Sequence, residues 1–208
     1  MESFLLIGSV LLIHFFALLS PGPDFIMAIK NSLRYSRNTG IFTAVGFGLG
    51  IAVHILYSIA GIALIISQSI ILFNIIKILG ALYLIYIGYK SITSKSSHAD
   101  LSTESAKEDI SPITAIRIGF LTNVLNPKAT LFFLSLFTLV ISPDTPTLTL
   151  VTMSLLMVMN TTIWFSLVAV FFTQKTVQNQ YKKFESIFNK IFGTALVALG
   201  IKVALTQK

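Results

Sequence analysis

Residues 4 to 33 read FLLIGSVLLIHFFALLSPGPDFIMAIKNSL, an apolar run with a helix-breaking sequence near its centre. Proline removes a backbone donor and clashes with the carbonyl four residues earlier, at a cost of about 3 kcal/mol inside a helix. Pro21 and Pro23 flank Gly22, so we expect the helix to open there and to resume at Asp24. Unpaired backbone groups at membrane depth are tolerated only where protein or a water-filled cavity satisfies them. The stretch therefore predicts a broken membrane helix, with the only acid of the apolar spans beside the break.

Long apolar runs recur along the whole chain. Hydrophobic residues make up 54% of the 208 residues and charged residues 11%, whereas soluble domains carry roughly 25% charged residues. A helix needs about 20 apolar residues to cross the hydrocarbon layer. We therefore expect an all-α, polytopic membrane protein with six spans, at about 4–33, 41–66, 70–90, 113–141, 148–173 and 191–206.

The distribution of lysine and arginine predicts the orientation of these spans. With six spans, eleven of the 15 cations fall on one side: Lys30, Arg34, Arg37, Lys90, Lys95, Lys107, Arg117, Lys175, Lys182, Lys183 and Lys190. Cytoplasmic loops of membrane proteins are enriched in these residues. We expect a cytoplasmic loop at 93–111 and both termini on the periplasmic or extracellular side. No basic cluster has a soluble domain around it, so we expect no binding of nucleic acid.

The fourth predicted span contains a second interruption, in RIGFLTNVLNPKATLFFLSLF at residues 117 to 137. Asn126 can cap a new half-helix, Pro127 suits its first position, and Asn123 should face the same side as the break. The loop at 93–111 separates two three-span repeats, residues 1–92 and 112–208, and an odd number of spans inverts the second repeat. Paired interruptions in corresponding spans indicate the binding site of a transporter.

Each interruption carries a charge. A charged side chain at the centre of a membrane helix costs about 2.5–3.5 kcal/mol, yet Asp24 lies at one break and Lys128 at the other. Lys128 would lie in the first turn of a half-helix, where the helix dipole is positive. We expect an anion close to it, either Asp24 or the carboxylate of a substrate. The alternative is that Lys128 extends to the membrane surface and Asp24 only caps its helix.

Other polar side chains in the spans have two interpretations. His54 follows Gly46 and Gly50 at four-residue spacing, which places all three on one helix face. Small residues permit close helix packing, but an imidazole can also relay protons near neutral pH. Asn160 and Trp164 share a face in the same way, and they either line a cavity or form hydrogen bonds between helices.

Four stretches of the chain resemble the lysine exporter (LysE/RhtB) superfamily of amino-acid efflux proteins. PGPD and NPKA at this separation are the most specific motifs. The stretches occur in family order: SPGPDFIMAIKNSLRYSRNTGIFTAVGFGLGIAVH from residue 20, KILGALYLIYIGYKSI from residue 77, FLTNVLNPKATLFF from residue 120, and KIFGTALVALGIKVAL from residue 190.

The resemblance implies a six-helix exporter in the bacterial inner membrane that moves small amino acids by proton antiport, neutral ones in preference to basic ones. It places residues 21–24 and 126–128 in the transport core and requires no cofactor beyond the proton gradient. It leaves open whether the protein forms a homo-oligomer.

Two other classes remain open as alternatives: a channel or membrane scaffold, and an intramembrane enzyme. The enzyme is disfavoured because the chain lacks an HExxH or GxSxG motif and a second carboxylate in the spans. The absence of cysteine also excludes disulfides and thiolate metal sites.

Overall fold

The computed structural model describes residues 2–20, 22–93, 108–140 and 145–205. Within these ranges every regular element is an α-helix, which confirms the all-α prediction. Pro21 and most of the predicted loop at 93–111 lie outside the described residues. The eight helices are α1 (Glu2–Leu19), α2 (Pro23–Arg34), α3 (Arg37–Gln68), α4 (Ile70–Thr93), α5 (Pro112–Val124), α6 (Pro127–Val140), α7 (Thr147–Phe171) and α8 (Lys175–Leu205).

Helices end at both of the interruptions seen in the sequence. The axes of α1 and α2 differ by 57° across the first break, and Pro23 occupies the first turn of α2 with Gly22 as its N-cap. At the second break α5 ends at Val124 and α6 begins at Pro127. Proline suits a helix start because its missing N–H would have no partner there. The same residues that break each helix therefore begin the next one.

Several helices are long and apolar enough to cross a membrane. By length and composition α3, α4, α7 and α8 qualify individually, and α1 and α2 pass the same test only as a bent pair, so the described residues hold four such helices, or up to five spans if that pair is one span. Leucines on the outer faces, such as Leu64 and Leu82, are about 60% exposed, as a lipid-facing surface requires. The chain is thus a multi-pass membrane protein. The predicted span at 113–141 falls on α5 and α6, which have 13 and 14 residues, so the count of six remains a prediction.

Helix α8 begins sixteen residues before the expected start of the sixth span at 191. The first half of α8 is rich in polar residues, so its low hydropathy predicts a loop rather than a membrane helix. Glu185 and Asn189 in this half are nevertheless buried. Glu185 is therefore a buried acid in addition to Asp24, at a position that the hydropathy of the sequence assigns to a loop.

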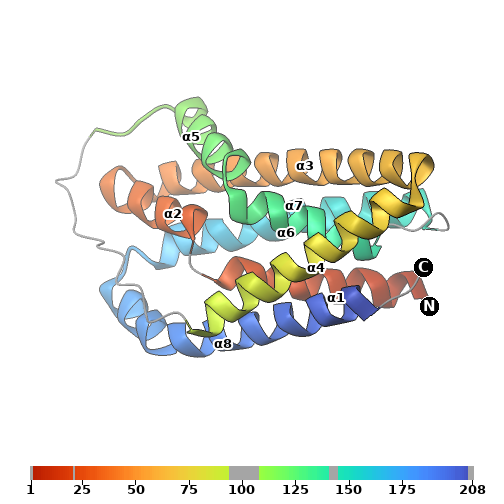
Figure 1. Ribbon diagram of the computed structural model, residues 1–208. Coiled ribbons are helices and arrows are strands. Elements are labelled where there is room, and N and C mark those ends of the chain that lie inside the picture. The colour runs from red at the N-terminus through yellow and green to blue at the C-terminus, as the bar shows by residue number, and fades with distance from the viewer. Residues whose placement is uncertain (1, 21, 94–107, 141–144, 206–208) are drawn as a thin grey trace.

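The connections gather at the two ends of the helix bundle (Figure 1). The α2–α3 connection, the start of α5 and the α7–α8 connection lie at one end. Arg34 ends α2, Arg37 begins α3 and Lys175 begins α8, so this is called the cation-rich end. Both chain termini and the α3–α4 turn lie at the other end. The most extensive helix contacts are those of α4 with α8, α3 with α5 and α3 with α7.

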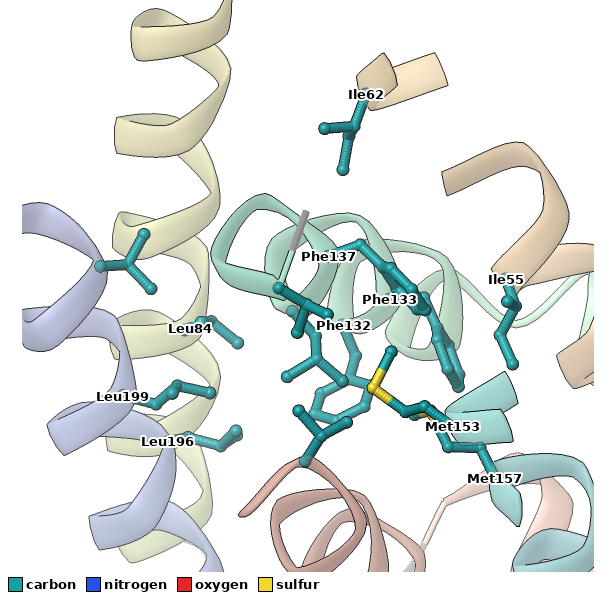
Figure 2. Packing of buried hydrophobic residues seen from close by; sticks show 14 of the residues in the cluster. Ile55, Ile62, Leu84, Phe132, Phe133, Phe137, Met153, Met157, Leu196 and Leu199 are labelled. Atoms are coloured by element: carbon teal, nitrogen blue, oxygen red, sulfur yellow. The ribbon is translucent and has the colours of Figure 1, made fainter. Parts of the chain in front are cut away.

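The short helix α6 lies at the centre of the main hydrophobic core (Figure 2). Phe133 and Phe137 of α6 are at most 1% exposed. Figure 2 shows them between Leu84 of α4 on one side and Met153 and Met157 of α7 on the other. Aromatic side chains bury a large apolar area, so α6 is fixed by its packing despite its length.

Helices α3 and α5 approach closely along the small-residue face that the sequence predicted. A Cβ atom added to Gly46 would overlap the carbonyl oxygen of Ile116 and lie 2.7 Å from the backbone nitrogen of Phe120. A Cβ atom on Gly50 would lie 2.5 Å from Oδ1 of Asn123. Backbone atoms of a packed helix cannot move aside cheaply, so this contact requires glycine at position 46.

We predict that Gly46→Ala lowers the stability of the protein, because the added methyl group forces α3 and α5 apart. Overpacking of this kind costs about 1–3 kcal/mol, or a fall in Tm of roughly 2–10 °C for a chain of this size. Thermal unfolding of the purified protein in detergent measures it. Gly61→Ala is the matched control in the same helix, because its added Cβ meets nothing within 4 Å. Equal Tm values for the two variants would contradict the close contact.

Asp109 joins the segment before α5 to the start of α3. Its Oδ2 accepts a hydrogen bond of 2.6 Å from Ser36 Oγ, and its Oδ1 accepts one from Thr39 Oγ1. Ser36 also caps α3, because its hydroxyl accepts from the backbone N–H of Thr39. The hydrogen bonds from Ser36 and Thr39 lower the pKa of Asp109, since they favour the charged carboxylate.

Asp109 should therefore stabilise the protein only while it is ionised. We predict that wild type is more stable than Asp109→Asn near neutral pH, and that the difference shrinks as the pH falls below the ordinary aspartate pKa of about 3.9. Thermal melts in detergent over a pH series test this. Glu108→Gln is the control for the loss of an exposed negative charge. A difference that does not depend on pH would show that the carboxylate has no such role.

Candidate functional site

The two helix breaks meet at Asp24. Its Oδ2 accepts hydrogen bonds from Nδ2 of Asn123 at 2.8 Å and from Nδ2 of Asn126 at 3.3 Å. Asp24 lies in the first turn of α2, Asn123 in the last turn of α5, and Asn126 between α5 and α6. Three predicted site residues from the two halves of the chain thus form one cluster. Asp24 Oδ1 and Asn123 Oδ1 are buried and have no hydrogen-bond partner among the described residues.

Lys128 lies beside this cluster and bonds to the first helix break. Its Nζ donates to Ser20 Oγ at 3.0 Å and to the Ser20 carbonyl oxygen at 3.4 Å. The ammonium also lies 5.2 Å from the centre of the Phe192 ring, as a cation–π contact requires. The hydrogen bonds of Asp24 come from asparagines, and those of Lys128 go to Ser20. The two predicted charges are thus neighbours that bond to different partners.

The position of Lys128 explains how a cation is tolerated in the first turn of a helix. In the first turn of α6 its charge is close to the positive end of that helix. The structure also places it at the C-terminal end of α1, where the dipole is negative and carbonyl groups lack partners. The α6 end is capped in turn by Asn126, whose Oδ1 accepts from the backbone N–H of Lys128 at 3.0 Å.

Three side chains from different helices bind the last carbonyl groups of α1. Trp164 Nε1 donates to the carbonyl of Leu18 at 3.2 Å, and the Tyr181 hydroxyl donates to that of Leu19 at 3.0 Å. Lys128 binds the next carbonyl, that of Ser20. The broken end of α1 is therefore satisfied by protein, as a membrane interior requires. Trp164 has a hydrogen-bonding role between helices and lines neither of the two cavities described below.

The other predicted polar residues lie around the cluster. His54 is fully buried, and its Nε2 lies 2.9 Å from the carbonyl oxygen of Asn123. Its Nδ1 lies 2.5 Å from the Tyr57 hydroxyl. Asn160 Nδ2 lies 3.4 Å from Nδ1 of His14, and Asn160 lines neither of the two cavities described below. His54 is thus one residue removed from Asp24, with Asn123 between them.

Two adjoining cavities border the helix breaks. The larger has a volume of about 440 Å³ and is bounded by α2, α4, α6 and α8. The smaller has about 50 Å³ and includes Asp24, His14 and Asn126 in its wall. Lys128 and Ser20 line both, whereas Asp24 lines only the smaller one. Lys128 therefore lies at the boundary between a space of ligand size and a small space that Asp24 borders.

Sequence reasoning missed several residues of the larger cavity. Tyr181, Glu185 and Asn189 line it from α8, together with Phe192. Their spacing of four, four and three residues is the period of one helix face. Extending that period upstream of Ile191 would have found them. No group of three or more metal-ligating side chains occurs in the described ranges.

We predict that Asn126→Ala destabilises the protein more than Asn126→Ser. The alanine removes both the cap of α6 and the donor to Asp24, whereas serine can still cap. Loss of an N-cap costs about 0.5–2 kcal/mol, and the thermal stability of the purified variants in detergent measures the difference. Asn38→Ala, on an exposed position of α3, is the control. Equal stability of the serine and alanine variants would exclude the capping role.

Comparisons with known proteins agree with this arrangement. A family model described as "LysE type translocator" matches residues 15–207. The uncharacterized membrane protein YrhP of Bacillus subtilis is 32% identical over 195 residues, which cover 89% of this chain and 92% of the relative. The threonine efflux protein of Escherichia coli is 26% identical over 96% of this chain and 97% of its own length.

A third relative covers a shorter segment. The leucine efflux protein of Salmonella choleraesuis is 35% identical over 63% of this chain and 61% of its own length. No solved structure matches the chain. The family match covers both helix breaks and all eight predicted residues of the transport core. The chain belongs to the LysE family of translocators, whose members are transporters and not enzymes.

Proposed function

We propose that this protein exports small, neutral amino acids from the bacterial cytoplasm in exchange for protons. The observation that carries the proposal is the meeting of two broken helices, with Asp24 and Lys128 at their ends, beside a cavity of about 440 Å³. Relatives described as threonine and leucine efflux proteins support the substrate class. Broken helices suit a zwitterion, because their ends present partial charges of both signs.

The proposed transport core comprises Pro21, Gly22, Pro23, Asp24, Asn123, Asn126, Pro127 and Lys128. The substrate carboxylate binds Lys128, which reaches the larger cavity. Gly22 lies beside it, since a Cβ atom there would be 3.7 Å from Lys128 Nζ. A glycine leaves this approach to the ammonium open.

Asp24 is proposed to carry the proton. The space beside it has about 50 Å³, enough for one or two water molecules at roughly 30 Å³ each. A substrate in the larger cavity therefore does not line up with Asp24 in this conformation, and the small space beside Asp24 has room only for water-sized molecules. Asp24 Oδ1, which has no hydrogen-bond partner among the described residues, is an acceptor for a proton, and protonation would weaken the attraction to Lys128. His54, linked through Asn123, is the second proposed proton-relay residue.

The proposed topology has six spans in two inverted repeats, with α5 and α6 together forming the fourth span. Contacts between equivalent helices support it, because α3 packs against α7 and α4 against α8. The cation-rich end is assigned to the cytoplasm and both termini to the periplasmic side of the inner membrane. Lys90 and Glu185 line the larger cavity near the cation-rich end, so this conformation faces the cytoplasm.

Proteoliposomes test the function with a panel of labelled amino acids, with and without a pH gradient. We predict that wild type accumulates neutral amino acids only with the gradient. Lys128→Gln should raise KM at least about tenfold, because it removes a charge-assisted hydrogen bond to the carboxylate. Asp24→Asn should abolish gradient-driven accumulation and retain exchange of labelled for unlabelled substrate. Lys30→Gln, an exposed position on α2, is the control.

Three outcomes would contradict the proposal. Absence of transport for the whole panel would overturn the amino-acid assignment. Wild-type transport that ignores the pH gradient and shows no counterflow would indicate a channel. Unchanged kinetics in both Lys128→Gln and Asp24→Asn would remove these residues from the mechanism.

A further inference from the structure

One face of α8 forms a wall of the larger cavity with polar groups. Tyr181, Glu185, Asn189 and Phe192 all line it. Glu185 is 3% exposed and Asn189 is 4% exposed, whereas Lys190 on the same helix is exposed. The acid and the amide thus face the protein interior, although the surrounding sequence is rich in lysine.

A buried carboxylate is costly unless positive charge or hydrogen-bond donors lie near it. Glu185 shares its cavity with two cations, Lys128 at the inner end and Lys90 at the cation-rich end. Asn189 contributes a further polar side chain one turn along the helix. Its backbone carbonyl accepts a hydrogen bond from Ser91 Oγ at 3.1 Å, which joins α8 to α4 there. The cavity is therefore lined by fixed charges of both signs, not by apolar groups alone.

The two charged groups lie at different depths. Glu185 precedes Phe192 by seven residues, which corresponds to about 10 Å along a helix. Lys128 Nζ lies 5.2 Å from the Phe192 ring. A small α-amino acid carries its ammonium and carboxylate on the same carbon atom, so these two groups span much less than the about 10 Å of helix between Glu185 and Phe192. The charges therefore define two positions along a path, an outer one at Glu185 and an inner one at Lys128.

We propose that Glu185 and Asn189 form a separate ammonium-binding site at the cytoplasmic end of the cavity. This inference rests on the proposed export of amino acids. The site binds the ammonium group of a zwitterionic or cationic amino acid before its carboxylate reaches Lys128. It discriminates against molecules that lack a positively charged amine. Glu185 thus binds the ammonium group of a substrate that enters from the cytoplasm. Asp24 lies in the other cavity and keeps its proposed role as the proton carrier.

Inverted membrane vesicles, which present the cytoplasmic face outward, test the site. Uptake of the amino acid best transported by wild type is measured for wild type, Glu185→Gln and the control Glu108→Gln, an exposed acid before α5. Competitors are the decarboxylated amine and the N-acetylated derivative of that amino acid. We expect Glu185→Gln to raise KM about tenfold and to weaken competition by the amine, with no change in competition by the N-acetyl derivative. KM from right-side-out vesicles should stay unchanged.

The results separate this inference from the proposed function. Wild-type transport with an unchanged KM in Glu185→Gln would overturn the ammonium site alone. The ammonium site would also be overturned if Glu185→Gln weakened competition by the amine and by the N-acetyl derivative equally, or if it raised KM equally in inverted and right-side-out vesicles. Either result would indicate a general structural effect of the substitution. If Glu185→Gln fails to accumulate in the membrane, Glu185→Asp takes its place, and an unchanged KM for that shortened acid would overturn the site. Absence of amino-acid transport by wild type would overturn both proposals.

Discussion

Everything in this site depends on the broken end of α1. A helix that stops inside a membrane leaves carbonyl groups without partners, and lipid cannot bind them. Here Trp164, Tyr181 and Lys128 donate to three successive carbonyls from three different helices. The requirement to satisfy one helix end thus fixes the positions of α6, α7 and α8 relative to α1. It also brings a lysine to a depth at which a charge would otherwise be unfavourable.

The same constraint explains why the two opposite charges are close but separately bonded. Asn126 caps α6 through its Oδ1 and donates to Asp24 through its Nδ2. Both polar ends of one amide are used, so the cap of the second break and the carboxylate of the first are coupled. Within the part of the chain that the structure describes, one oxygen of Asp24 has no hydrogen-bond partner, and Lys128 lines the larger cavity. Hydrogen bonds thus fix the positions of both side chains, while Asp24 Oδ1 and the side of Lys128 that lines the cavity are not used by those bonds.

The sequence predicts the breaks well, because Pro21, Pro23 and Pro127 act locally on the backbone. Apolar length likewise predicts that the chain crosses a membrane repeatedly. The sequence cannot show that Trp164 binds the carbonyl of Leu18, since that contact joins residues far apart in the chain. It also missed Glu185, because hydropathy averages over all faces of a helix and α8 buries one polar face. The helical spacing of the polar residues on α8 predicts this buried face, whereas the average hydropathy of the segment does not.

The two parts of each broken helix share one neighbouring helix and differ in the others. Helix α2 shares a hydrophobic cluster with α3 and α7, whereas α1 also contacts α8. Helix α5 lies against the glycine face of α3, whereas α6 also packs against α4. Few contacts join α5 directly to α6. Mechanically, each break is a joint between two segments that share one neighbouring helix and differ in another, so a small rotation at either break would move the walls of both cavities without bending any intact helix.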